Sequence, residues 1–137
     1  MESKLKLDRI ITAVSFKIRY FQGAMPICAM LLQCFDENTS YWLLKYLLFK
    51  CSYIQNDMVL YSSFLADLEA EMKIALPKVL ISLGEKGFFL NDFVMRWVMG
   101  LFSEDLPKPL LLSFWDGLCQ SNLWFIKHFI ISILTFL

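Results

Sequence analysis

NDFVMRWVMGLFSEDLPKPLLLSFWDGLCQ, residues 91–120, is the stretch of this sequence that decides its fold. Asn91 and Asp92 are typical helix caps, and the apolar positions that follow them recur at the three- and four-residue spacing of one helix face. Leu106-Pro107-Lys108-Pro109 interrupts this pattern, and a second apolar run extends from Leu110 to Cys119. The stretch therefore predicts two helices joined by a turn.

The same helical spacing continues on both sides of that stretch, and no pair of strands joined by a hairpin turn is visible. The sequence thus predicts an all-α fold, a single domain of about eight packed helices. The longest helix is expected after Asn56-Asp57, with apolar positions from Met58 to Met72. The other predicted helices run from Leu5 to Phe16, from Pro26 to Cys34, from Tyr41 to Cys51 after a cap at Asp36–Thr39, from Pro77 to the glycines Gly84 and Gly87, and from Leu123 to Phe136.

Composition limits the classes of function. Hydrophobic residues make up 58% of the 137 residues, above the usual 45–50%, and the formal net charge is zero. A nucleic-acid-binding domain normally carries a basic face, so that class is not expected. The most apolar segment, Leu123 to Leu137, is shorter than the roughly 20 residues of a spanning helix and contains Lys127 and His128. We therefore expect buried helices and no integral span, and peripheral association with endomembranes stays open.

Four cysteines are present, at positions 28, 34, 51 and 119. They form no C-x-x-C pair, and His128 is not at metal-ligand spacing from them, so no metal site is predicted. No long apolar run follows Met1 as it would in a signal peptide. The simplest expectation is reduced, buried cysteines in a cytoplasmic protein.

Three stretches, in this order, resemble the TBC domain, the all-helical module of Rab GTPase-activating proteins. Tyr20-Phe21-Gln22-Gly23 resembles the family's Y-x-Q-G motif at the start of an apolar helix. Tyr41-Trp42, after an acidic cap, resembles its aromatic pair. The third resembles the pattern W-x-x-x-L-F-x-x-x-L-P followed by W-D, here carried by Trp97, Leu101, Phe102, Leu106, Pro107, Trp115 and Asp116. The order and spacing of these motifs agree from about Leu7 to Leu134.

The resemblance implies a function and a site residue. TBC proteins bind the GTP form of a Rab GTPase and supply two residues to its active site, an arginine finger and a glutamine finger. The arginine offsets charge on the transferring phosphoryl group and can contribute roughly 10³–10⁵-fold in rate. By position, Gln22 is the glutamine finger, supported by Tyr20 and Gly23, with Gly23 expected to allow a tight turn. GTP and Mg²⁺ belong to the partner GTPase, so no cofactor is expected in this chain.

One half of the catalytic pair departs from the family pattern. The arginine motif, I-x-x-D-x-x-R, precedes Y-x-Q by several helical turns, but only 19 residues precede Tyr20 here. The nearest match begins at Leu5, has Asp8 in the Asp position and ends at Ile11 where the motif has Arg. We therefore expect residues 1–137 to resemble the C-terminal part of a TBC domain without the arginine-finger segment. Whether the family's last helices are also missing stays open, as does the alternative of a membrane-associated helical protein unrelated to GTPases.

Other prominent residues are interpreted structurally. Trp97, Phe102 and Trp115 are expected in the core, because aromatic residues at helical spacing are usually buried there. Asp116 is expected to accept hydrogen bonds from the backbone or a neighbouring helix. The carboxylates of Asp67, Glu69 and Glu71 are expected on a solvated face. No nucleophile–base or metal constellation is present, so the chain is interpreted as a regulator of a GTPase and not as an enzyme.

Overall fold

The computed structural model describes residues 2–15 and 23–136, without the side chains of residues 52–56. These residues form eight helices and no strand, which confirms the predicted all-α fold. The helices are α1 (Glu2–Ser15), α2 (Ala24–Cys34), α3 (Glu37–Asn56), α4 (Met58–Ala75), α5 (Pro77–Glu85), α6 (Asn91–Met99), α7 (Lys108–Gln120) and α8 (Trp124–Thr135).

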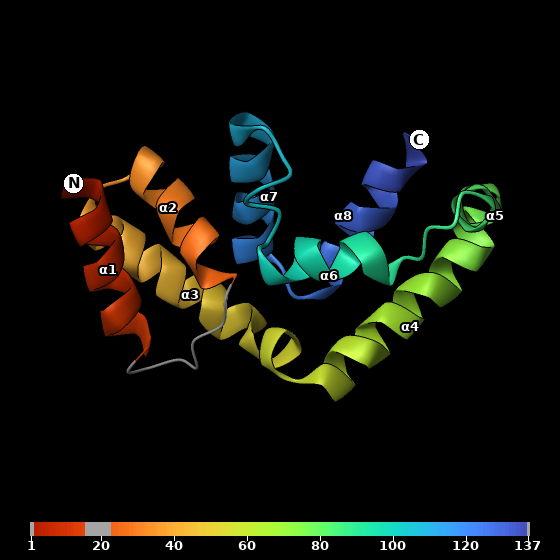
Figure 1. Cartoon of the computed structure of the whole chain (residues 1–137), viewed down its shortest axis with the longest axis horizontal. Helices are drawn as coiled ribbons and strands as arrows, with labels where there is room; N and C mark the ends of the chain where they lie inside the picture. The colour runs from red at the N-terminus through yellow and green to blue at the C-terminus, as the bar shows by residue number, and fades with distance from the viewer. Residues whose placement is uncertain (1, 16–22, 137) are drawn as a thin grey trace.

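The helices are arranged around a bent arm (Figure 1). α1, α2 and α3 pack against one another, and α3 continues through a bend at Asp57 into α4, whose far end carries α5. α6, α7 and α8 occupy the inside of the bend. The α3 side of the arm is tied to α7, because the Tyr46 hydroxyl and Lys50 ammonium both donate to the carbonyl of Cys119, at 3.1 and 3.0 Å. A carbonyl in the last helical turn lacks an intrahelical donor, and these side chains supply one.

Three residues predicted to start helices are confirmed in that role, although α3 begins at Glu37, within the predicted cap segment, and not at Tyr41. The Asp36 carboxylate accepts the backbone N–H of Thr39 at 2.7 Å at the start of α3, and this bond lowers the pKa of Asp36. Asp57 caps α4 by accepting the N–H groups of Val59 and Leu60. Pro77 lies in the first turn of α5.

Two predictions about helix length and position were wrong. The longest helix is α3, with 20 residues against 18 in α4, because the segment after Cys51 contains no Gly or Pro and the helix continues to Asn56. α7 begins at Lys108, two residues before the predicted start, because Pro109 is accommodated in its first turn, where no backbone N–H is required.

Asn91 and Asp92 begin α6 but do not cap it as predicted. The residue before the helix is Leu90, which has no capping side chain. The Asp92 carboxylate reaches back to the N–H of Phe89 at 2.7 Å, and the Asn91 side-chain carbonyl accepts the hydroxyl of Tyr61 on α4 at 2.8 Å. Both side chains therefore fix the position of α6 instead of closing its first turn.

One apolar core connects all regions of the fold. It contains residues from both ends of the chain, such as Ile10 and Val14 of α1 and Ile130 and Leu134 of α8. Phe102 and Trp115 are buried, and Trp97 is half-buried and packs on the core, as predicted. An added Cβ at Gly117 would overlap the Phe125 ring, so glycine allows α7 and α8 to approach there.

The cysteines and the α4 carboxylates differ in part from prediction. All four cysteines are free, but only Cys28 and Cys51 are fully buried. Burial raises the pKa of these two thiols to about 12. Asp67 and Glu69 are exposed as predicted. Glu71 is not purely solvated, because it pairs with the buried Lys127 at 2.7 Å. The sequence pattern did not indicate a buried lysine, since a charged residue in an apolar run usually faces solvent.

Candidate functional site

The stretch predicted to carry the glutamine finger ends in the sequence at Gly23, immediately before α2. Gln22 and Tyr20 fall outside the described residues, whereas Gly23, the neighbour of Gln22, is described. Gly23 immediately precedes α2 with φ of −66° and ψ of −15°, values that any residue adopts. The backbone of Gly23 itself thus makes no use of the conformational freedom of glycine, and the tight turn expected at this motif stays a prediction. Pro26 lies in the first turn of α2, as predicted.

Gly23 borders an open groove of about 560 Å³ between the start of α2 and α6. The groove extends to the loop that follows α6, so it brings together the first and third family-like stretches of the sequence. Its lining residues are Gly23, Pro26, Asn91, Asp92, Met95, Arg96, Met99, Gly100 and Glu104.

The loop after α6 has an unusual backbone. Leu101 and Phe102 have φ of +46° and +61°, the left-handed region that residues other than Gly rarely occupy. Such a conformation costs of order 1–3 kcal/mol per residue. Both side chains are fully buried, and burying one large apolar side chain contributes roughly 1.5–3 kcal/mol. Apolar burial therefore offsets the strain, which explains why the loop carries Leu and Phe instead of Gly.

Trp115 on α7 holds this loop in place. Its indole N–H donates to the carbonyl of Leu101 at 3.0 Å in the core. The N–H of Phe102 donates to the carbonyl of Trp97 at 3.0 Å, and the two aromatic rings stack at 5.1 Å. The Trp, Leu-Phe and Trp positions of the third stretch thus form one structural unit that ends the helix and turns the chain beside the groove.

Arg96 is the arginine of this groove, and the sequence analysis missed it. Its side chain is 61% exposed, and its guanidinium pairs through two nitrogens with Asp105 in the loop, with Nε 3.2 Å from Oδ2. Two carboxylates of the lining, Asp92 and Glu104, form no ion pair with a described residue. A signal was present in the sequence: Arg96 adjoins Trp97 and lies two positions from each of the buried residues Val94 and Val98, which places it on the outer face of α6.

Arg9 is not brought to this groove. It projects from α1 and forms a bidentate pair with Glu37 at the start of α3, with distances of 2.6 and 2.8 Å. The hydrogen bond from Arg9 lowers the pKa of the Glu37 carboxyl. This pair lines a separate groove of about 410 Å³ between α1 and α3. Ile11, at the final position of the nearest arginine-motif match, is half-buried against the core.

The remaining predicted residues have structural positions. Pro107 immediately precedes α7, in an extended conformation that ends the loop. Asp116 is exposed and makes no hydrogen bond to a described residue, so its role as an acceptor stays a prediction. Tyr61, which holds Asn91 at the groove, is buried, and burial raises its pKa to about 12, so its hydroxyl keeps its proton for that bond.

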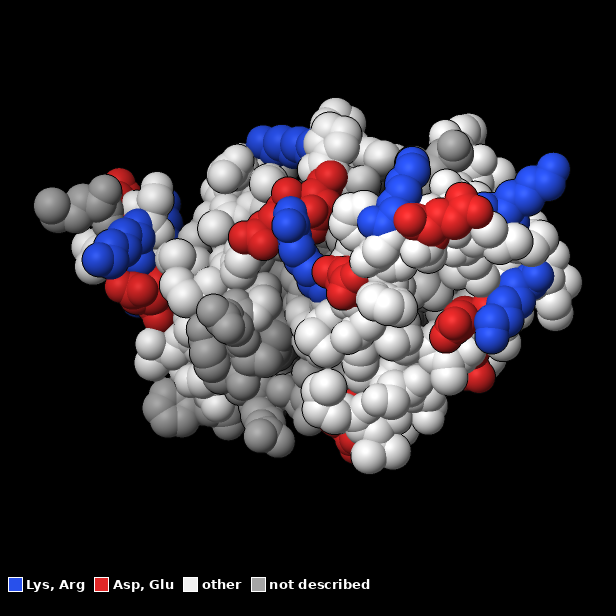
Figure 2. Space-filling model, turned by 45° about the vertical axis from the view of Figure 1, so that its right-hand side comes forward, with Lys and Arg blue, Asp and Glu red and all other residues white. Residues whose placement is uncertain are grey.

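The charges of the protein are mixed. On the face shown in Figure 2, basic and acidic side chains lie beside one another among uncharged residues, and no large patch of one sign is visible. The lining of the groove itself carries the carboxylates of Asp92 and Glu104 and the guanidinium of Arg96, which pairs with Asp105. The described residues include no helix that is long and apolar enough to cross a membrane.

Comparison with known proteins identifies the family. A TBC1 domain family member 2A of Bos taurus is 22% identical over 138 residues, which cover 96% of this chain and 15% of that protein. A TBC1 domain family member 14 of Rattus norvegicus is 24% identical over 120 residues, which cover 85% of this chain and 17% of that protein. The chain thus spans less than a fifth of the length of these relatives, and no solved structure matches it. Because the model of the Rab-GTPase-TBC domain matches residues 2–137, the chain belongs to the Rab-GTPase-TBC domain family.

Proposed function

We propose that this chain binds a GTP-loaded Rab GTPase through the groove beside Gly23 and presents Gln22 to the nucleotide. The observation that supports this most is that two family-like stretches meet at one groove. Gly23, which follows Gln22 in the sequence, lines the groove on one side. On the other side lie Arg96, which precedes Trp97, and Glu104, which follows Phe102 by two positions. Gln22 would position the attacking water. The GTPase would supply the nucleotide and its Mg²⁺, so this chain is a regulator and carries out no reaction alone.

The 137-residue chain is expected to bind a Rab without accelerating its GTP hydrolysis. No arginine occupies the final position of the arginine-motif match, where Ile11 stands, and an arginine finger contributes roughly 10³–10⁵-fold. A phosphate-release assay over a panel of GTP-loaded Rab proteins tests this. Acceleration by orders of magnitude that disappears in Gln22→Ala would show that the chain is catalytically complete.

The binding surface can be tested with two matched arginine variants. Arg96→Ala is expected to weaken Rab binding about tenfold, equivalent to ~1.4 kcal/mol. Arg9→Ala serves as the control, because Arg9 is also an exposed, ion-paired arginine but lines the other groove. Calorimetric titration measures both. Equal effects of the two variants, or no effect of Arg96→Ala, would reject the groove beside Gly23 as the docking surface.

We further propose peripheral contact with a membrane surface through α3. Trp42, Tyr46 and Phe49 are spaced four and three residues apart on this helix and are 56%, 47% and 76% exposed. Lys45 lies 5.0 Å from the centre of the Trp42 ring. Exposed aromatic rings beside lysines are typical of segments that rest at the boundary between lipid headgroups and acyl chains.

Vesicle sedimentation tests this contact. Vesicles that contain phosphatidylserine are expected to retain the wild-type chain and to lose at least half of the bound fraction with Trp42→Ala/Phe49→Ala. The double variant Ile74→Ala/Ile81→Ala is the control, because these residues are equally apolar and exposed but lie on α4 and α5. Binding that both double variants reduce alike would contradict a specific role of α3.

A further inference from the structure

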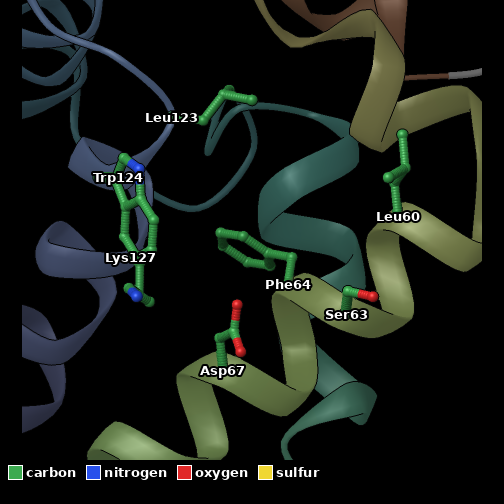
Figure 3. Close-up of a pocket in the computed structure, with 7 residues that line it drawn as sticks. All are labelled: Leu60, Ser63, Phe64, Asp67, Leu123, Trp124 and Lys127. Atoms are coloured by element: carbon green, nitrogen blue, oxygen red, sulfur yellow. The ribbon is translucent and has the colours of Figure 1, made fainter.

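A further cavity lies between α4 and the start of α8 and shares no lining residue with the groove beside Gly23. Its volume is about 190 Å³, and Figure 3 shows the side chains of the two helices facing each other across it. The lining residues are Leu60, Ser63, Phe64, Asp67, Leu123, Trp124 and Lys127. Pockets for drug-sized ligands hold roughly 300–1,000 Å³, so an occupant here is small.

Lys127 forms a fixed part of the cavity wall. Its side chain is 3% exposed, and its ammonium lies 2.7 Å from Oε1 of Glu71 and 3.7 Å from the centre of the Trp124 ring. The carboxylate neutralises the buried charge, and the aromatic face adds a cation–π contact. The ammonium therefore already has its counter-charge before any ligand enters.

Asp67 provides an unpaired carboxylate in the lining of the cavity. Its carboxylate extends into the space below Phe64 in Figure 3. It forms no ion pair or hydrogen bond with any residue that the structure describes. Two carboxylates, Asp67 and Glu71, thus accompany one ammonium, that of Lys127, and the local net charge is negative. A positively charged ligand is favoured at this position, because an opposite charge near Asp67 lowers the electrostatic energy.

An anionic ligand is disfavoured by the state of the donors around the cavity. A helix start offers free N–H groups to anions, but those at α8 are occupied. The N–H of Trp124 donates to Oδ1 of Asn122 at 2.9 Å, and the N–H of Phe125 donates to the Asn122 carbonyl at 3.0 Å. Lys127 is committed to Glu71. An anion would therefore meet the Asp67 carboxylate with no free backbone donor to compensate for it.

The remaining walls fit an apolar stem. Leu60, Phe64 and Leu123 are apolar, and Trp124 closes the side opposite α4 (Figure 3). We propose that this cavity binds a primary ammonium group on a short, unbranched apolar stem, the chemistry of a lysine side chain or of a small alkylamine. The ammonium lies at Asp67, and the stem lies between Phe64 and Trp124.

Three probes with the same stem and different head groups test the proposal. The intact chain is titrated with pentylammonium chloride, pentanol and sodium pentanoate, and the Trp124 indole N–H signal is followed by nuclear magnetic resonance, with Trp124→Phe used to assign it. We expect saturable shifts with pentylammonium, at least fivefold weaker binding of pentanol, and no saturation with pentanoate. Equal affinities for the three probes, or no saturation with pentylammonium, would overturn the proposal.

Two matched variants locate the charge that is recognised. Asp67→Asn is expected to reduce pentylammonium affinity to that of pentanol. Glu69→Gln removes a carboxylate from the same helix outside the cavity and is expected to leave the affinity within twofold. An equal loss in both variants would show a general charge effect and refute the site. A parallel titration with Nα-acetyl-lysine methylamide assigns the source: binding as tight as that of pentylammonium indicates a protein lysine, and weaker binding indicates a free amine.

Discussion

Trp115→Phe is expected to lower the free energy of unfolding by about 3 kcal/mol. The substitution removes the indole N–H that donates to the Leu101 carbonyl at 3.0 Å in the core. A buried carbonyl left without a donor costs roughly 1–3 kcal/mol, and the smaller ring leaves a cavity that adds to this. The carbonyl also belongs to the first of two left-handed residues, so the bond that restrains the strained loop is lost with it.

Trp97→Phe provides the control for this prediction. It removes the same atoms from a half-buried tryptophan whose indole N–H makes no hydrogen bond to the residues described, and its ring stacking on Phe102 is largely retained. A loss of about 1 kcal/mol or less is expected. Urea unfolding followed by circular dichroism measures both variants. Similar losses for Trp115→Phe and Trp97→Phe would mean that ring volume, and not the buried hydrogen bond, determines the stability of the loop.

Helical periodicity made most of the fold predictable. Apolar residues at three- and four-residue spacing predicted where helices lie, because residues at this spacing share one face of a helix and that face packs against neighbouring helices. Residues that start a helix through local interactions were also predictable. Asp36 caps the first turn of α3, and Pro77 lies in the first turn of α5. Some helix boundaries were predicted wrongly. α3 extends further than predicted because no Gly or Pro follows Cys51 to end it, and α7 starts earlier than predicted because Pro109 fits into its first turn.

Features that depend on distant contacts could not be predicted. The left-handed conformation of Leu101 and Phe102 contradicts local preference and is stable because α7 brings Trp115 to the Leu101 carbonyl. The groove beside Gly23 joins residues separated by about 70 positions, so spacing along the chain did not point to Arg96. Of the residues that carry the first motif, Gly23 is described, and it borders that groove.

The buried Lys127 leads to the second large effect. Glu71→Ala is expected to lower the free energy of unfolding by about 2 kcal/mol, because it leaves a buried ammonium without its carboxylate. Removing one partner of a fully buried ion pair costs roughly 3–5 kcal/mol. The Glu71 side chain is 42% exposed, so water can reach the site it vacates, and the expected loss is smaller than that range.

Lys127→Met separates the cost of the unpaired charge from the value of the pair. Methionine fills a similar volume and contacts the Trp124 ring, and replacing a buried ion pair by apolar side chains is often close to neutral. We therefore expect Lys127→Met to change the free energy of unfolding by less than about 1 kcal/mol. In the Lys127→Met background, Glu71→Ala is expected to cost almost nothing further, because no buried ammonium is left unpaired.

Urea unfolding of the two single variants and the double variant measures this cycle. If Glu71→Ala were equally costly with and without Lys127, the carboxylate would stabilise the fold by contacts other than the ion pair. The expected coupling of about 2 kcal/mol assigns the stabilisation to the neutralised lysine at the wall of the cavity between α4 and α8.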